Sequence, residues 1–302
     1  MTEALPPRAL TLAAAAWPIE RHASWDALAG KLARWVSEAA EAGADIAVLP
    51  EYAGLEAAFT GPDRRLDTAG WCARAADAAP RYAALCATLA QDHALTLLSG
   101  SLPAGTGGAL VNRACLCRPD GRVLPVDKQI LTPWERDHTP LAPGPALPAL
   151  ETPEGRLATL ICYDAEFPPL ARALAADILL VPSCTEAAHG AARVEVAARA
   201  RALEGQGVAV LAPLLGAVPD CEIVDANTGT AGIFAPPDTP FPPGGILARG
   251  VPDTPGWVTA TLAAGALGAT RRHGAVTPRA DMAGAEARAR HATPGERPAL
   301  RP

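Results

Sequence analysis

The stretch at residues 157–168, L-A-T-L-I-C-Y-D-A-E-F-P, has the pattern of a strand followed by a turn and the start of a helix, the unit from which an α/β fold is built. Its first six residues are apolar apart from one threonine, which predicts a short buried strand that ends at Cys162. Pro168 and Pro169 then begin an alanine- and leucine-rich helical segment, because proline is tolerated in the first turn of a helix. Cys162 is therefore predicted to lie at a strand-to-helix turn, where backbone N–H groups favour a thiolate and an adjacent oxyanion. A buried structural cysteine fits the same pattern, so the role of Cys162 depends on residues elsewhere.

The rest of the chain alternates predicted strands with predicted helices. Hairpins interrupt this alternation, so the pattern indicates an α/β fold with layers of mixed sheets rather than a uniform parallel barrel. One helix is expected between a cap at Ser24 and a stop at Gly43, and two more at residues 73–93 and 191–205. The other strands are expected at residues 8–17, 46–50, 94–99, 111–117, 122–126, 178–181, 208–211, 233–234, 246–247 and 257–262.

Length and composition set the general class of protein. The 302 residues are 49% hydrophobic with a net charge of −6, which predicts a globular chain without a general nucleic-acid footprint. No apolar stretch reaches the roughly 18 residues that span a bilayer, and the first residues lack a signal-peptide pattern, so no membrane association is expected. The seven cysteines are scattered and odd in number, which predicts a reducing, cytoplasmic location. Residues 268–302 are rich in Arg, Ala and Pro, and we expect a mobile tail after a domain at residues 1–267.

Three polar residues share a position at, or just past, the end of a predicted strand: Glu51, Lys128 and Cys162. Strand ends on one edge of an α/β sheet converge on a crevice, where such folds bind ligands. A cysteine nucleophile needs a base, and a carboxylate whose pKa is raised by burial can serve. A lysine ammonium can stabilise a developing oxyanion. The set is therefore sufficient for acyl transfer from an amide or a nitrile. Only two of the 26 cationic residues are lysines, at positions 31 and 128, which is a further reason to single out Lys128.

Glu51, Lys128 and Cys162 lie in three longer motifs: L-P-E-Y at 49–52, D-K-Q-I-L-T-P-W-E at 127–135 and L-I-C-Y-D-A-E-F-P at 160–168. Two further motifs are V-P-S at 181–183 and A-R-A-L-E-G-Q at 200–206. Together these motifs resemble those of the nitrilase (carbon–nitrogen hydrolase) superfamily, in the family's order and over about residues 8–262. The resemblance implies a four-layer α-β-β-α sandwich that commonly forms a homodimer, and it implies no metal or cofactor.

The resemblance also implies a role for each matching residue. Glu51 would be the general base, Lys128 the cation that stabilises the oxyanion, and Cys162 the nucleophile that forms an acyl-enzyme. Glu135 would orient Lys128 or the substrate and help to activate the hydrolytic water. The backbone N–H of Tyr163 would add a donor to the oxyanion hole.

The residues around Cys162 also carry an expectation about substrate. Cys162-Tyr163-Asp164 resembles the amidase branches more than true nitrilases, which usually have Cys-Trp-Glu, so we predict cleavage of a small-molecule amide or carbamoyl bond. Glu166 stands where several branches that act on carboxylate-bearing amides have arginine. We hypothesise that it disfavours anionic substrates and suits neutral or amine-bearing ones; the alternative is a local ion pair with Arg172. Candidate pocket walls, equally explained by core or interface packing, are Tyr52, Phe59, Trp134, Glu166 and His189.

Four other interpretations stay open at this point. Nitrile hydrolysis uses the same nucleophile. An N-acyltransferase would pass the same acyl group to an amine instead of water. A papain-like Cys–His pair would use His189, but it leaves Glu51 and Lys128 without a role. A non-catalytic scaffold would leave all four matching polar residues unexplained.

Overall fold

The computed structural model describes residues 5–62 and 64–292, and its strands join into one twelve-stranded sheet. The order along this sheet is β5-β4-β3-β2-β1-β9-β8-β7-β6, with β12 paired to β1, and β10 and β11 following β9. The strands are β1 (Leu10–Pro18), β2 (Ile46–Leu49), β3 (Thr96–Thr106), β4 (Ala109–Cys117), β5 (Val123–Asp127), β6 (Ala149–Thr152), β7 (Gly155–Thr159), β8 (Ile178–Ser183), β9 (Val208–Leu215), β10 (Gly232–Phe234), β11 (Ile246–Arg249) and β12 (Gly256–Leu262).

A short parallel contact between β1 and β9 divides this sheet into two packed halves. There Trp17 and Pro18 pair with Leu214 and Leu215. Side chains alternate across β1, as the two-residue period of a strand requires. Those at even positions from Leu10 join the apolar cluster shared with β7, β8 and β9, whereas those at odd positions from Ala13 pack toward α1 and α2. Both faces of β1 are therefore buried.

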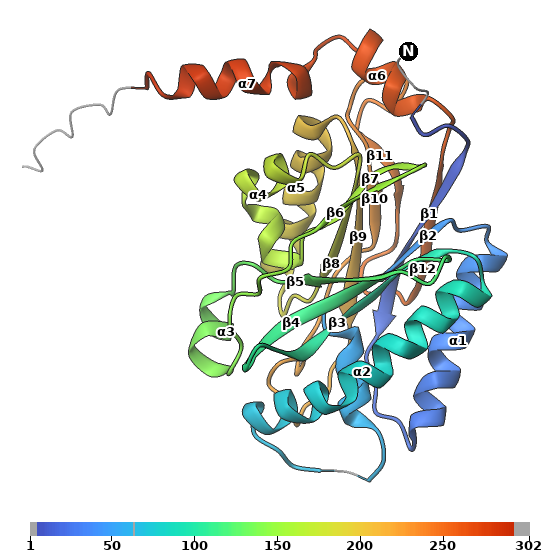
Figure 1. The fold of residues 1–302 in the computed structure, drawn as a ribbon, viewed down its shortest axis with the longest axis vertical. Helices are drawn as coiled ribbons and strands as arrows, with labels where there is room; N and C mark the ends of the chain where they lie inside the picture. The colour runs from blue at the N-terminus through green and yellow to red at the C-terminus, as the bar shows by residue number, and fades with distance from the viewer. Residues whose placement is uncertain (1–4, 63, 293–302) are drawn as a thin grey trace, which may run out of the picture.

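Helices cover the outer face of each half, which gives the expected four-layer α-β-β-α sandwich (Figure 1). Helix α1 begins after Ser24, whose side chain accepts a hydrogen bond from the amide of Ala27, and this confirms the predicted cap. In the described residues, no helix has the length and apolar character needed to cross a membrane. The helices are α1 (Trp25–Glu41) and α2 (Thr68–Asp92) on one side, α4 (Pro168–Leu174) and α5 (Ala188–Gly205) on the other, with α3 (Pro133–His138), α6 (Ala266–His273), α7 (Pro278–Ala289) and the short 3₁₀ helices η1 (Ala53–Phe59) and η2 (Cys162–Glu166).

Several predicted strand ends were wrong. Strands β8 and β9 continue to Ser183 and Leu215 instead of ending at residues 181 and 211. Strand β3 continues to Thr106 instead of ending at residue 99, because a bulge at Gly100 carries the chain past the glycine. Gly100 has φ +71°, and a Cβ atom there would lie 2.7 Å from the carbonyl oxygen of Pro50. Strand β7 ends at Thr159 instead of Cys162, because the chain turns sharply at Cys162, where φ is +50°.

The C-terminal segment, where a mobile tail was expected, contains two helices, α6 and α7. Two arginines of this segment, Arg271 and Arg279, have partners in the body of the fold. Arg279 donates to the carbonyl oxygens of Ala175, Ala176 and Gly205 at the C-terminal ends of α4 and α5, where cations are favourable. Residues 293–302 lie outside the described residues, so the domain limit at 267 and the mobility of the tail remain predictions.

Candidate active site

The ends of three strands bring Glu51, Lys128 and Cys162 to one cavity. Glu51 follows β2, Lys128 follows β5, and Cys162 begins η2 directly after the β7 segment. The Nζ atom of Lys128 lies 2.8 Å from Oε1 of Glu51, and all three side chains are at most 5% exposed. The three residues line a cavity of about 610 Å³. The expected convergence of these strand ends is thus present.

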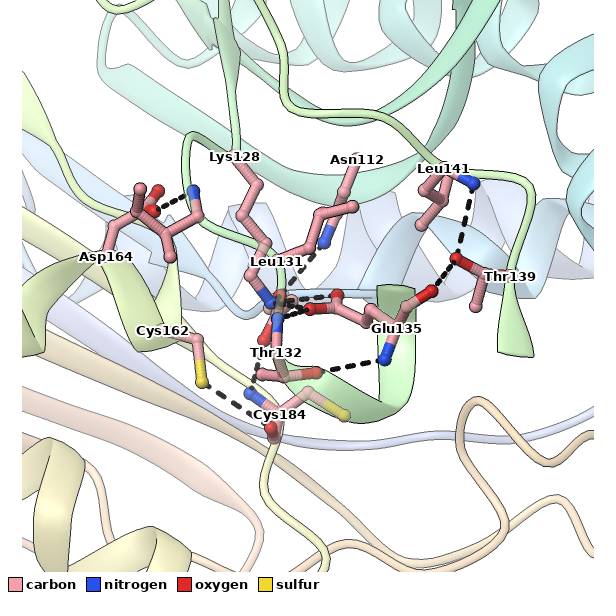
Figure 2. A network of polar contacts seen from close by, with 12 residues as sticks. Asn112, Lys128, Leu131, Thr132, Glu135, Thr139, Leu141, Cys162, Asp164 and Cys184 are labelled. Atoms are coloured by element: carbon pink, nitrogen blue, oxygen red, sulfur yellow. Dashed lines mark hydrogen bonds and ion pairs between the residues drawn. The ribbon is translucent and has the colours of Figure 1, made fainter. Parts of the chain in front are cut away.

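Glu135 joins the same cluster through the first turn of α3 (Figure 2). Thr132 and Glu135 form a capping box, in which the Thr132 amide donates to Oε2 of Glu135 at 2.8 Å. Lys128 Nζ lies 2.8 and 2.7 Å from the two carboxylate oxygens of Glu135, and the Tyr52 hydroxyl donates to Oε1 at 2.7 Å. The short helix α3 therefore points its only buried carboxylate at Lys128.

Two residues that the sequence analysis did not select hold Glu51 in place. Asn112, in β4, donates its Nδ2–H to Oε1 of Glu51 at 2.9 Å, and the backbone amide of Cys184 donates to Oε2 at 3.0 Å. The sequence signal that could have found Asn112 is that it is the one side-chain amide in the mostly apolar strand β4, between Val111 and Arg113. Cys184 directly follows the V-P-S motif at the end of β8.

The backbone at Cys162 adopts a conformation that projects the thiol into the cavity. Its φ of +50° lies in the left-handed region, which costs free energy for a residue with a Cβ atom and is frequent at functional sites. The thiol donates to the carbonyl oxygen of Cys184 at 3.6 Å, and the charge of Glu51 also acts on it. Asp164 anchors the turn from the other side, because its carboxylate accepts hydrogen bonds from the amides of Gln129 and Ile130, next to Lys128.

Burial and the crowding of charges set the protonation states of the cluster. Burial raises the pKa of Glu51 to about 7; Lys128 opposes the rise and Glu135 adds to it. Burial would lower the pKa of Lys128, but the two carboxylates outweigh it and raise that pKa well above its ordinary value. Burial opposes ionisation of Glu135 as well, yet Lys128 holds its pKa below the ordinary value.

The same forces keep Cys162 protonated at rest. Burial, followed by the nearby Glu51 carboxylate, raises the pKa of the Cys162 thiol well above its usual value. This outcome is opposite to the expectation that the turn alone favours a thiolate. Because the thiolate is the nucleophile, the thiol needs a base at the moment of attack, and Glu51 is the carboxylate whose charge acts most strongly on it.

Most of the predicted wall residues line this cavity, and one does not. Tyr52, Trp134 and His189 are on its wall, as are Tyr163 and Glu166. Phe59 is instead buried in the core on the α2 side, where its ring packs edge-on against Trp71 at 5.0 Å. This correction follows from η1, whose seven residues are all buried and carry Phe59 away from the cavity.

Glu166 forms an ion pair, but its partner is not Arg172, the partner named in the sequence analysis. Glu166 lies 3.3 Å from the guanidinium of Arg193 in α5, whereas Arg172 pairs with Glu286 in α7 at 3.1 Å. Both Glu166 and Arg193 line the cavity. His189 is exposed on the same wall, whereas the thiol of Cys162 hydrogen-bonds to the carbonyl oxygen of Cys184. Within residues 5–62 and 64–292, no three or more His, Cys, Asp or Glu side chains cluster in a way that could hold a metal ion.

Comparison with known proteins shows which family this chain resembles in sequence. The family model described as carbon-nitrogen hydrolase matches residues 11–218. A probable hydrolase of Bacillus subtilis is 32% identical over 233 residues, which are 76% of this chain and 45% of that protein. An omega-amidase of Danio rerio is 29% identical over 189 residues, 59% of this chain and 65% of that protein.

The fold is also found in a solved structure. The crystal structure of an amidase from Nesterenkonia sp. superposes with a TM-score of 0.67 and 24% identity, covering 84% of this chain and 90% of that one. This similarity shows a shared fold. Among the relatives matched by sequence, the chain spans about half the length of the first two.

Proposed function

The chain belongs to the carbon-nitrogen hydrolase family of the nitrilase superfamily, and from this premise we propose that it is a thiol amidohydrolase acting on a small-molecule amide or carbamoyl compound. The observation that carries the proposal is the contact of one lysine with two buried carboxylates beside a buried thiol in a single cavity. Each group has the chemistry that acyl transfer through a thioester requires.

In the first half of the reaction, Cys162 attacks the amide carbonyl. The S–H bond breaks, its proton passes to Glu51, and its electron pair forms the S–C bond while the carbonyl π electrons move to oxygen. The oxyanion is stabilised by the Lys128 ammonium and by the backbone N–H of Tyr163. When the intermediate collapses, the C–N bond breaks, the amine leaves with the proton from Glu51, and an acyl-enzyme remains.

In the second half, water replaces the amine. Glu51 accepts a proton from water as the water attacks the thioester carbonyl, and the proton then returns to the departing sulfur. Glu135 keeps Lys128 in place throughout, through contacts of 2.7 and 2.8 Å to both of its oxygens. With both glutamates ionised, the cluster carries a net charge of −1, and proton transfer from Cys162 creates the oxyanion without changing that total. No additional charge is buried in the transition state, which keeps its cost low.

The charged groups on the cavity wall favour a substrate class. Glu166 pairs with Arg193 at 3.3 Å, so Arg193, which lines the cavity, is already engaged with a carboxylate. We therefore propose neutral or amine-bearing amides as substrates. Replacement of Glu166 by Arg is expected to raise kcat/KM for an anionic amide relative to a cationic one of equal length. An unchanged ratio would reject this assignment.

The experiment that tests the function measures ammonia release from primary amides and carbamoyl compounds with anionic, neutral and amine-bearing groups, and from one nitrile. The control is the Cys162→Ala variant. We expect release from at least one amide, lost in the variant, with an acyl mass added to Cys162 in intact-protein mass spectra. Formation of an N-acyl product when an amine is added would indicate an acyltransferase instead. The absence of both turnover and acylation would refute the proposal.

We also propose that the protein is a homodimer and is cytoplasmic. Helix α5 exposes Val196 and Leu203, 66% and 47% accessible, at a spacing of seven residues that places them on one face. A second copy of the chain would cover this apolar stripe. Light scattering is expected to give a dimer that Val196→Glu and Leu203→Glu together convert to a monomer. A reducing cytoplasm would keep the nucleophile as a thiol.

A further inference from the structure

Asn112 touches both the candidate base and the segment that carries the lysine. Its side chain is fully buried in β4, and Nδ2 donates to Oε1 of Glu51 at 2.9 Å. Its backbone oxygen accepts a hydrogen bond from the amide of Lys128 at 2.9 Å. A change at Asn112 is therefore felt directly by the Glu51 carboxylate, from a strand that supplies none of the groups assigned to the reaction so far.

The donors around Glu51 divide unequally between its two oxygens. Oε1 accepts from both Asn112 Nδ2 and Lys128 Nζ, whereas Oε2 accepts from the backbone amide of Cys184. The carbonyl oxygen of Cys184 is the group that lies 3.6 Å from the Cys162 thiol. Oε2 and the Cys162 thiol thus share Cys184 as a hydrogen-bond partner, and Oε1 is occupied by two side-chain donors.

Building on the proposed function, we propose that Asn112 is a positioning residue that holds Glu51 through Oε1 and so reserves Oε2 for the proton of Cys162. When the S–H bond breaks, the proton moves to Oε2 and the electron pair of the thiol forms the S–C bond with the substrate carbonyl. The hydrogen bond from Asn112 to Oε1 is kept during this transfer. Because an ionised carboxylate only accepts hydrogen bonds, Asn112 favours the form of Glu51 that can act as a base.

The other atom of the amide argues against a purely structural role. Oδ1 of Asn112 is buried and has no hydrogen-bond partner among the described residues. A buried acceptor without a partner is destabilising, and an apolar side chain of the same shape would avoid that cost. The residue is better explained by what Nδ2 does for Glu51 than by its contribution to packing.

The test follows the alkylation of Cys162 by iodoacetamide as a function of pH, measured by mass spectrometry on the peptide that contains Cys162. This readout does not depend on knowing a substrate. The variants are Asn112→Leu, which removes the donor but keeps the branched shape of the side chain, and Asn112→Asp, which replaces the amide with a carboxyl group. Thr96→Val is the matched control, because it also removes a buried hydrogen bond, the one between Thr96 and Arg118. Thr96 is the first residue of β3, whereas Asn112 pairs with Pro103 farther along that strand.

We expect the wild-type alkylation rate to rise through pH about 7 as Glu51 ionises. A hydrogen bond to a charged group is worth roughly 1.5–3 kcal/mol, so Asn112→Leu is expected to move this rise upward by about one to two pH units. Asn112→Asp is expected to move it further, because a second carboxylate disfavours ionised Glu51. Thr96→Val should leave the midpoint unchanged.

A midpoint that stays at the wild-type pH in both Asn112 variants would overturn the inference, whether or not the variants are less stable. If the midpoint moves but no amide is turned over by the wild type, the positioning role stands and the proposed hydrolase activity fails. If amides are turned over and the midpoint does not move, the activity stands and the role of Asn112 is rejected.

Discussion

Replacement of Glu135 by glutamine is expected to make the enzyme slower and, at the same time, active at lower pH. Lys128 lies between two buried carboxylates, each of which has an oxygen 2.8 Å from Nζ. Burial raises the pKa of Glu51 to about 7, Lys128 opposes this, and the negative charge of Glu135 adds to the rise. Glutamine at 135 removes that repulsion and also frees Lys128 to interact more strongly with Glu51.

The size of the pH effect follows from the distances. Because Oε1 of Glu51 and Oε1 of Glu135 both contact the same nitrogen, they are at most about 5.6 Å apart. At an effective dielectric constant of about 20, two unit charges at that distance repel by about 3 kcal/mol, the equivalent of about two pKa units. We therefore expect the acid limb of kcat/KM to move down by about one to two pH units. The loss of a charged hydrogen bond to Lys128 should lower the plateau by about 10- to 100-fold.

The assay is kcat/KM between pH 4.5 and 9 for an amide that the wild-type protein hydrolyses. Glu135→Asp is the matched control, because it keeps the charge and shortens the side chain. Its plateau is expected to fall while its acid limb stays near that of the wild type. An acid limb that stays in place or moves upward in Glu135→Gln would refute the account of the cluster as two carboxylates competing for one lysine.

Three further predictions concern stability. The folded-state pKa of Glu51, about 7, is above its ordinary value of 4.5, so its contribution to stability is complete below pH 4.5 and lost as pH rises through 7. The free energy of unfolding of Glu51→Gln, relative to that of the wild type, should therefore rise by up to about 3 kcal/mol from pH 5 to pH 8 in urea unfolding. An equal difference between variant and wild type at the two pH values would contradict this. Cys162→Gly is expected to be more stable than Cys162→Ala by about 1 kcal/mol in the same assay, because φ is +50° there, and equal stability would argue against strain. Arg279→Ala is expected to lose about 1–3 kcal/mol by thermal unfolding if α7 is docked through its carbonyl contacts, whereas a free tail predicts no change.

The order of elements was accessible from the sequence because strands and helices leave a local pattern. The cap at Ser24 and the hairpin of β4 and β5 are contacts between neighbours in the chain, and both were predicted correctly. The errors occurred where a distant contact overrides the local pattern. Gly100 reads as a strand end, yet it is a bulge under the backbone of Pro50. Arg279 likewise carries no local sign of its partners, because the carbonyl oxygen of Ala175 that it contacts is 104 residues away in the chain.

By itself, the sequence determined which chemistry is present: a thiol, a lysine and two carboxylates at strand ends, in an order that identifies the family. Only the tertiary structure decided how those groups are held and charged. Asn112 and Cys184 reach Glu51 across 61 and 133 residues of chain, so no local pattern marks them as its partners. The raised pKa of Glu51 likewise depends on burial and on Glu135, which are properties of the packed fold. The physical reason is range: strand and helix patterns arise from neighbouring residues, whereas a buried site is made by side chains that meet only after the sheet has formed.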